Sequence, residues 1–69
     1  MKHTIDARGL SCPQPLILAT RAMKEPGSFE IIVDNVVARE NVVRMLAERY
    51  RLTPQVRESG RDITIRVDR

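Results

Sequence analysis

The stretch of sequence that decides the fold reads Asp6-Ala7-Arg8-Gly9-Leu10-Ser11-Cys12-Pro13-Gln14-Pro15-Leu16. It contains the only cysteine of the chain and is followed by an apolar-periodic run. Proline is favoured in the first turn of a helix, because its missing N–H would have no partner inside the helix there. We therefore predict a helix that begins with Pro13 at position N1 and Pro15 at N3. Pro13 also disfavours helical geometry at the residue before it, which makes Cys12 the predicted N-cap.

A second register competes at the same helix start. Ser11 would be the N-cap, and Gln14, three residues later, would complete a capping box. We rank this register second because it requires Cys12 to be helical directly before a proline. In both registers the sulfur lies within one turn of the helix start, where the helix dipole and the N–H groups of Gln14 and Leu16 favour an anion. This position predicts a lowered thiol pKa.

The residues before the cysteine predict a tight loop. Gly9 suits a turn that requires a positive φ, and Asp6 suits an Asx-type turn in which its carboxylate accepts hydrogen bonds from nearby N–H groups. A lone cysteine is most often a buried side chain without chemical function. Cys12 instead falls in a connection of Gly, Ser and Pro residues, and such connections lie at the surface. We therefore favour a functional thiol.

Strand and helix patterns alternate along the rest of the chain. We predict strands at 4–6, 29–34, 55–58 and 62–67, one helix at 13–24, and a second helix from an N-cap at Asp34-Asn35 to about residue 50. Two strands joined by a helix form a parallel pair, and the last two strands form a hairpin through Ser59-Gly60. The expected fold class is α/β (α+β), a two-layer βαβαββ sandwich with a mixed four-stranded sheet and both helices on one face. We expect residues 1–69 to form a single domain.

Each predicted helix has an apolar face that is expected to be buried. The predicted buried positions are Leu16, Leu18, Ala19, Ala22 and Met23 in the first helix, and Val36, Val42, Val43, Leu46, Ala47 and Tyr50 in the second. On the polar side of the first helix, Gln14, Ile17 and Arg21 are spaced i, i+3 and i+7 and form a stripe that runs away from Cys12. This stripe is a candidate partner-binding surface, and Arg8 would add electrostatic steering toward an acidic partner.

The composition narrows the classes of function. One cysteine excludes an internal disulfide and a Cys-x-x-Cys redox pair, and with His3 as the only histidine we expect neither a zinc site nor a cofactor. A free thiol suits a reducing compartment, and no apolar run has the length of a signal or transmembrane segment, so a cytoplasmic protein is expected. The net charge of +3 suggests nucleic acid as a partner, but the charges are interspersed and the only aromatic residues are Phe29 and Tyr50. Direct nucleic-acid binding is therefore not expected.

The motif around the cysteine resembles a known family. Asp6-Ala-x-Gly-Leu-x-Cys12-Pro-x-Pro15 is similar to the signature of the TusA/SirA-like sulfur-carrier proteins, and the similarity covers nearly the whole chain. Two later segments resemble the branch represented by the amino-terminal half of YedF-type proteins: Val33-Asp34-Asn35 and Ala38-Arg39-Glu40-Asn41-Val42. One departure is Gln14, where several members carry Glu, so an anionic side chain next to the thiol is absent here.

The resemblance implies a two-layer fold and a role as a sulfur carrier. Cys12 would accept sulfane sulfur as a persulfide from a cysteine desulfurase or another sulfur-donor protein, and pass it to a downstream acceptor protein. Routes implied by the family include tRNA thiolation, molybdenum cofactor synthesis and selenium or sulfur metabolism. Because no general base lies near Cys12 in the sequence, we expect a sulfurtransferase-type carrier, without a self-contained active site, that acts as a monomer. The competing hypothesis is a small regulatory or RNA-binding module in which Cys12 is only structural.

Overall fold

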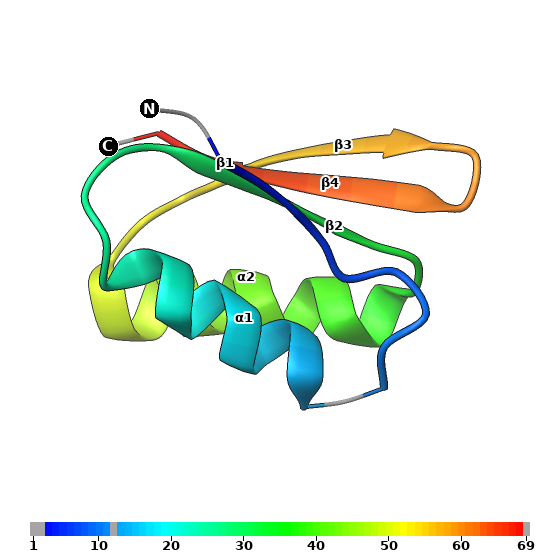
Figure 1. The fold of residues 1–69 in the computed structure, drawn as a ribbon, viewed down its shortest axis with the longest axis horizontal. Coiled ribbons are helices and arrows are strands. Elements are labelled where there is room, and N and C mark those ends of the chain that lie inside the picture. The colour runs from blue at the N-terminus through cyan, green and yellow to red at the C-terminus, as the bar shows by residue number, and fades with distance from the viewer. Residues whose placement is uncertain (1–2, 12, 69) are drawn as a thin grey trace.

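The computed structural model describes residues 3–11 and 13–68. Figure 1 shows the order of its elements along the chain. They are β1 (His3–Asp6), α1 (Gln14–Met23), β2 (Phe29–Val33), α2 (Val36–Tyr50), β3 (Gln55–Ser59) and β4 (Asp62–Val67). The βαβαββ order predicted from the sequence is confirmed, with ends that differ by at most one residue.

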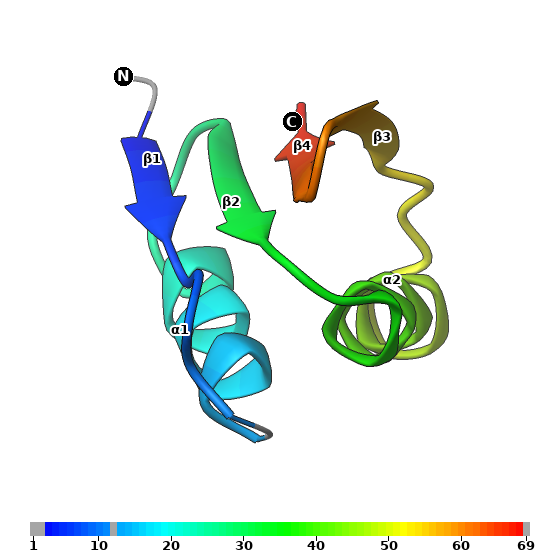
Figure 2. The same cartoon turned by 90° about the vertical axis from the view of Figure 1, so that its right-hand side faces the viewer.

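The strands form a mixed sheet in the order β1-β2-β4-β3. β1 and β2 are parallel, as the intervening helix requires, whereas β2 pairs with β4 and β4 with β3 in antiparallel fashion. Figure 2, which looks along the helices, shows α1 and α2 side by side on one face of this sheet. The chain therefore has the predicted α+β sandwich of two layers.

The core lies between the sheet and the helices. Alternate residues of the two central strands point into it, as the period of a strand dictates. These residues are Phe29, Ile31 and Val33 of β2 and Ile63, Ile65 and Val67 of β4, all of them buried. From α1, Ala19 and Met23 complete the core, in agreement with the predicted apolar face of this helix.

The buried face of α2 differs from the prediction. Ala38, Val42, Met45 and Leu46 are buried, whereas Val36, Ala47 and Tyr50 are exposed. The reason is that α2 contacts both β4 and α1, so its apolar surface is turned toward the neighbouring helix. Val42 and Leu46 are buried as predicted, whereas Val43 and Ala47 line an open groove beside Val56 of β3.

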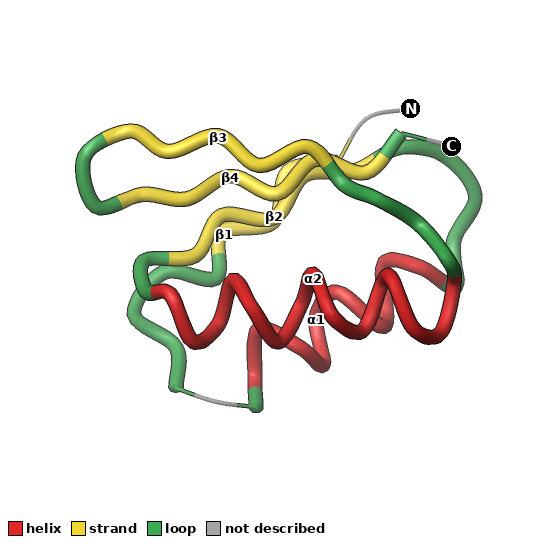
Figure 3. The backbone as a smooth tube through the Cα atoms, turned by 180° about the vertical axis from the view of Figure 1, so that it is seen from behind, coloured by secondary structure: helices red, strands yellow, loops and turns green. Residues whose placement is uncertain are grey.

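The β3–β4 hairpin extends beyond the helix layer, as Figures 1 and 3 show. All five residues of β3 are exposed, because β3 is an edge strand that neither helix covers. The two-residue turn after Ser59 contains Gly60 at a φ of 61°, which supports the turn predicted there.

Both ends of α2 show defined capping. The Asn35 side chain accepts a hydrogen bond from the N–H of Ala38 at 2.8 Å, so the N-cap predicted at Asp34-Asn35 is confirmed and assigned to Asn35. At the other end Arg51 adopts the left-handed conformation with a φ of 54°, and the N–H of Leu52 bonds to the carbonyl of Leu46.

Candidate functional site

The candidate site is the loop that joins β1 to α1, at the end of the molecule where α2 also begins (Figure 3). Cys12 itself lies outside the described residues. Its neighbours in the sequence, Ser11 and Pro13, are both exposed. The described parts of the loop and of α1 define the surroundings in which any chemistry at this position takes place.

The helix starts later than either predicted register. The carbonyl of Pro13 accepts the first helical hydrogen bond, from the N–H of Ile17 at 3.0 Å, while its own ψ of 21° is not helical. Pro13 is therefore the N-cap, and the predictions of Cys12 or Ser11 as N-cap and of Pro13 at N1 are wrong. Pro15 consequently occupies position N2 instead of N3. The cause is a reverse turn that precedes the helix, in which the N–H of Gln14 donates to the carbonyl of Ser11 at 2.9 Å.

This turn also changes the donors expected to face the thiol. The N–H of Gln14 is already bonded to Ser11, so the prediction that it is free for an anionic sulfur is wrong. The corresponding statement for Leu16 stays a prediction.

Pro15 has a packing role that the sequence did not reveal. It is buried, whereas Pro13 is exposed. A small cavity is lined by both prolines and Leu16 from the start of α1 and by Ala38 and Asn41 of α2, which places the first turns of the two helices against each other. Pro15 thus fixes the start of α1 against α2, directly behind the cysteine-containing loop.

Asp6 and Arg8 shape the first half of the loop. The Asp6 carboxylate accepts a hydrogen bond from the backbone N–H of Arg8 at 3.1 Å, which confirms the predicted Asx-type turn. The Arg8 guanidinium donates to both carboxylate oxygens of Asp6, at 2.9 and 2.8 Å, and to Asp62 at 3.0 Å. Hydrogen bonds from this guanidinium are the main reason that the pKa of Asp6 falls to about 2, and the same contact raises the pKa of Arg8.

These ion pairs bear on the predicted role of Arg8 in partner binding. Its charge is compensated by two carboxylates of its own chain, Asp6 and Asp62. Steering of an acidic partner by Arg8 stays a prediction, but the contacts show another function for this side chain. It ties the loop before Cys12 to the start of β4.

A second contact holds the loop to the end of β2. Gly9 has a φ of 76°, as predicted, and its N–H donates to the Asp34 carboxylate at 2.9 Å. Two residues earlier, the N–H of Ala7 donates to the carbonyl of Ile32 at 2.8 Å and extends the parallel pairing of β1 with β2. Asp34 and Asp62 were not assigned to this site from the sequence. Asp34 could have been found, because the ends of parallel neighbouring strands meet at one edge of the sheet.

The predicted partner-binding stripe lies on the surface. Gln14, Ile17 and Arg21 are all exposed, and Ile17 leaves 46% of its surface accessible. With Arg8, these residues flank the loop and the outer side of α1, but they form no hydrogen-bonded cluster among the described residues. The role of this stripe in partner binding stays a prediction.

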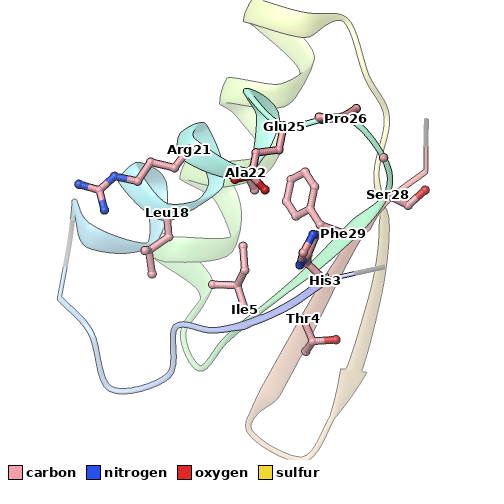
Figure 4. A pocket seen from close by; sticks show the side chains of 11 residues that line it. His3, Thr4, Ile5, Leu18, Arg21, Ala22, Glu25, Pro26, Ser28 and Phe29 are labelled. Atoms are coloured by element: carbon pink, nitrogen blue, oxygen red, sulfur yellow. The ribbon is translucent and has the colours of Figure 1, made fainter. Parts of the chain in front are cut away.

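A separate cavity of about 260 Å³ lies between β1 and α1 (Figure 4). Its wall contains Ile5, Leu18, Ala22 and Phe29, with His3 and Glu25 at its rim. No described residue of the loop between β1 and α1 lines it, so this cavity is distinct from the candidate site.

Among residues 3–11 and 13–68, no cluster of His, Cys, Asp and Glu side chains could hold a metal ion. Neither helix in this part of the chain is long and apolar enough to cross a membrane.

Comparisons with known proteins agree on one group. The family model described as "Sulfurtransferase TusA" matches residues 3–69 of this chain. Among solved structures, the crystal structure of a SirA-like protein from Desulfitobacterium hafniense superposes with a TM-score of 0.78 at 31% sequence identity. That alignment covers 97% of this chain and 99% of the other. The search of curated proteins gave no match.

Proposed function

Because this chain belongs to the TusA sulfurtransferase family, and so has a sulfur-carrier role, we propose that Cys12 is the residue that carries the sulfur. The observation that carries the proposal is that Cys12 is the only cysteine in a chain of this family. Among protein side chains, a cysteine thiolate has the nucleophilicity that attack on sulfur requires. A protein with one cysteine therefore has one position at which sulfane sulfur can be held as a persulfide.

The proposed reaction consists of two displacements at sulfur. The Cys12 thiolate attacks the terminal sulfur of a persulfide on a donor protein, the donor S–S bond breaks, and the donor leaves as a thiolate. In the second step an acceptor thiolate attacks the terminal sulfur of the Cys12 persulfide and releases the Cys12 thiolate. Each step exchanges one S–S bond for another, so neither requires an external oxidant or reductant.

The anchored loop supports this proposal. Arg8, Gly9 and Pro15 fasten the backbone on both sides of Cys12, through Asp62, Asp34 and the packing of α1 on α2. Such anchoring limits the conformations of the loop in which a partner must reach the sulfur, and pre-organisation of this kind favours transfer. Asp6, Gly9, Pro13, Pro15, Gln14 and Leu16 are thus proposed to support Cys12, and none of them is proposed to react.

The partners follow from the same chemistry. We propose a cysteine desulfurase or another sulfur-donor protein on one side, a sulfur-acceptor protein on the other, and a reducing compartment such as the cytoplasm. Gln14, Ile17 and Arg21 are the proposed contact residues, because the partner's sulfur must reach Cys12 and this stripe borders it in the sequence. Residues 1–69 are proposed to act as one domain.

The test is to incubate the reduced protein with a cysteine desulfurase and cysteine and to measure the intact mass. We expect the parent protein to gain the mass of one sulfur atom and to lose it again on treatment with a thiol reductant. The Cys12→Ser variant should keep its original mass. If the variant gains sulfur as readily as the parent, or if the parent gains none, Cys12 is not the carrier residue.

A further inference from the structure

A groove of about 290 Å³ lies between the two helices and shares Arg21 with the lining of the cavity beside β1. Its lining comes from both helices: Leu16, Ile17, Thr20, Arg21 and Lys24 belong to the α1 segment, and Met45 and Arg49 to α2. It includes Ile17 and Arg21 of the predicted stripe but not Gln14. The structure therefore shifts this candidate surface from one helix to the junction of two.

The groove combines an apolar floor with a cationic rim. Ile17 is 46% exposed, and Leu16 is half-buried beside it. The Thr20 hydroxyl donates to the carbonyl of Leu16 at 2.8 Å, so its hydrogen atom is already bonded within the helix. Arg21, Lys24 and Arg49 are exposed around these residues.

These three cations differ from the arginines of the molecule that form ion pairs. Arg8, Arg39 and Arg66 each pair with a carboxylate of the chain. Within residues 3–11 and 13–68, none of Arg21, Lys24 and Arg49 forms an ion pair, and no carboxylate lines the groove. Their charge is therefore available to a ligand that is anionic.

The groove borders the candidate site, because Leu16 lines both this groove and the small cavity that Pro13 lines. It begins at Leu16 and Ile17, in the first turn of α1, and reaches Lys24 at the end of that helix. Arg21 also lines the cavity beside β1, and Figure 4 shows its guanidinium extending away from His3 and Phe29. A protein interface of ordinary size covers about 800 Å² on each partner, so a partner that reaches Cys12 would also cover this groove.

We propose that this groove binds an acidic, amphipathic segment of the protein that exchanges sulfur with Cys12, an inference that rests on the proposed function. Apolar side chains of the segment contact Leu16, Ile17 and Met45, and its carboxylates pair with Arg21, Lys24 and Arg49. Charge complementarity and the apolar floor together favour a protein segment over RNA. RNA binding of this kind uses aromatic side chains for stacking, and no aromatic residue lines the groove.

The first experiment uses synthetic helical peptides and amide NMR spectra of the isotopically labelled protein. One peptide carries glutamates on one face and leucines on the other, and its control has serine in place of each leucine. We expect the leucine peptide to shift the amide signals of Ile17, Arg21, Lys24, Met45 and Arg49, and the serine peptide to bind at least several-fold more weakly. An RNA hairpin that shifts the same signals at lower concentration than the leucine peptide would overturn the proposal in favour of nucleic acid.

The second experiment links the groove to sulfur transfer. The double variant Arg21→Glu/Arg49→Glu should bind the leucine peptide about tenfold more weakly and accept sulfur from a cysteine desulfurase about tenfold more slowly. The reason is that two partly exposed charge pairs become repulsive. Arg57→Glu on β3, which does not line the groove, is the matched control and should behave as the parent. Inorganic polysulfide, which needs no docking surface, should load parent and double variant at equal rates.

The outcomes separate the two proposals. If polysulfide and desulfurase both fail to load the parent protein, the proposed function is wrong. If the parent loads but the double variant takes sulfur from the desulfurase at the parental rate, or if Arg57→Glu is impaired to the same extent, the proposed groove is wrong and the proposed function stands.

Discussion

At the scale of single residues, Arg8 and Asp6 set the shape of the loop before Cys12. The guanidinium of Arg8 joins a carboxylate two residues upstream to one at the start of β4. The Asx-type turn at Asp6 was predictable because it depends on neighbouring residues alone. The partner Asp62 was not, since it is distant in the sequence and comes close only through the strand order of the sheet.

The lowered pKa of Asp6 predicts a pH dependence of stability. In the unfolded chain an aspartate titrates near pH ~3.9, whereas in the folded protein the pKa is about 2. The stabilising effect of the ionised carboxylate is therefore present above about pH 4 and is lost as the pH falls toward 2. Denaturant titrations should show Asp6→Asn to be less stable than the parent at neutral pH, with a difference that shrinks across this window. A difference that is the same at pH 7 and near pH 2 would show that this ionisation does not contribute.

The reactivity of Cys12 is the second prediction at this scale. Because the thiol directly precedes the N-cap of α1, we expect its pKa to lie below the ~8.5 of a free cysteine. The rate of alkylation by iodoacetamide as a function of pH measures this pKa, with free cysteine under the same conditions as reference. An apparent pKa at or above the reference would remove the electrostatic part of the account.

At the scale of elements, the start of α1 shows what local sequence rules can and cannot predict. The two prolines correctly indicate a helix start, but the rules place it one residue too early, since they do not foresee the reverse turn from Ser11 to Gln14. The burial of Pro15 could not be predicted from the sequence either, because it depends on how α1 packs against α2. The same helix contact turned the buried face of α2 toward Ala38 and Met45, away from the predicted Ala47 and Tyr50.

The two prolines should therefore respond differently to substitution. Pro15→Ala removes buried apolar surface and should lower the free energy of unfolding by about 1–2 kcal/mol. Pro13→Ala affects an exposed residue, so the free energy of unfolding should change by less than about 0.5 kcal/mol. Because Pro13 restricts the backbone of the preceding Cys12, its replacement should still slow sulfur loading. Denaturant titrations and loading rates of the two variants measure these effects.

Two results would contradict this division of roles. Equal losses of stability in Pro13→Ala and Pro15→Ala would mean that the helix contact at Pro15 is unimportant. A parental loading rate in Pro13→Ala would mean that this proline serves only to begin the helix.

At the scale of the whole molecule, the strand order brings three distant segments to one end. The loop before Cys12, the end of β2 at Asp34 and the start of β4 at Asp62 meet there through Gly9 and Arg8. The alternating strand and helix patterns were sufficient to predict the order of elements, the parallel β1–β2 pair and the two layers. The contacts that anchor the loop required the sheet order, which a single sequence does not contain. The basic groove between the helices was missed for the same reason, because Arg49 and Arg21 belong to different helices.

The central claim is that the chain holds transferable sulfane sulfur on Cys12, and cyanolysis tests it most directly. Cyanide attacks the terminal sulfur of a persulfide, so thiocyanate forms and the protein returns as its thiolate. After loading and removal of the donor, the parent protein should release one thiocyanate for each sulfur atom that its mass shows to be lost. The Cys12→Ser variant should release none. Thiocyanate from the serine variant, or sulfur on the parent that cyanide cannot remove, would contradict the account.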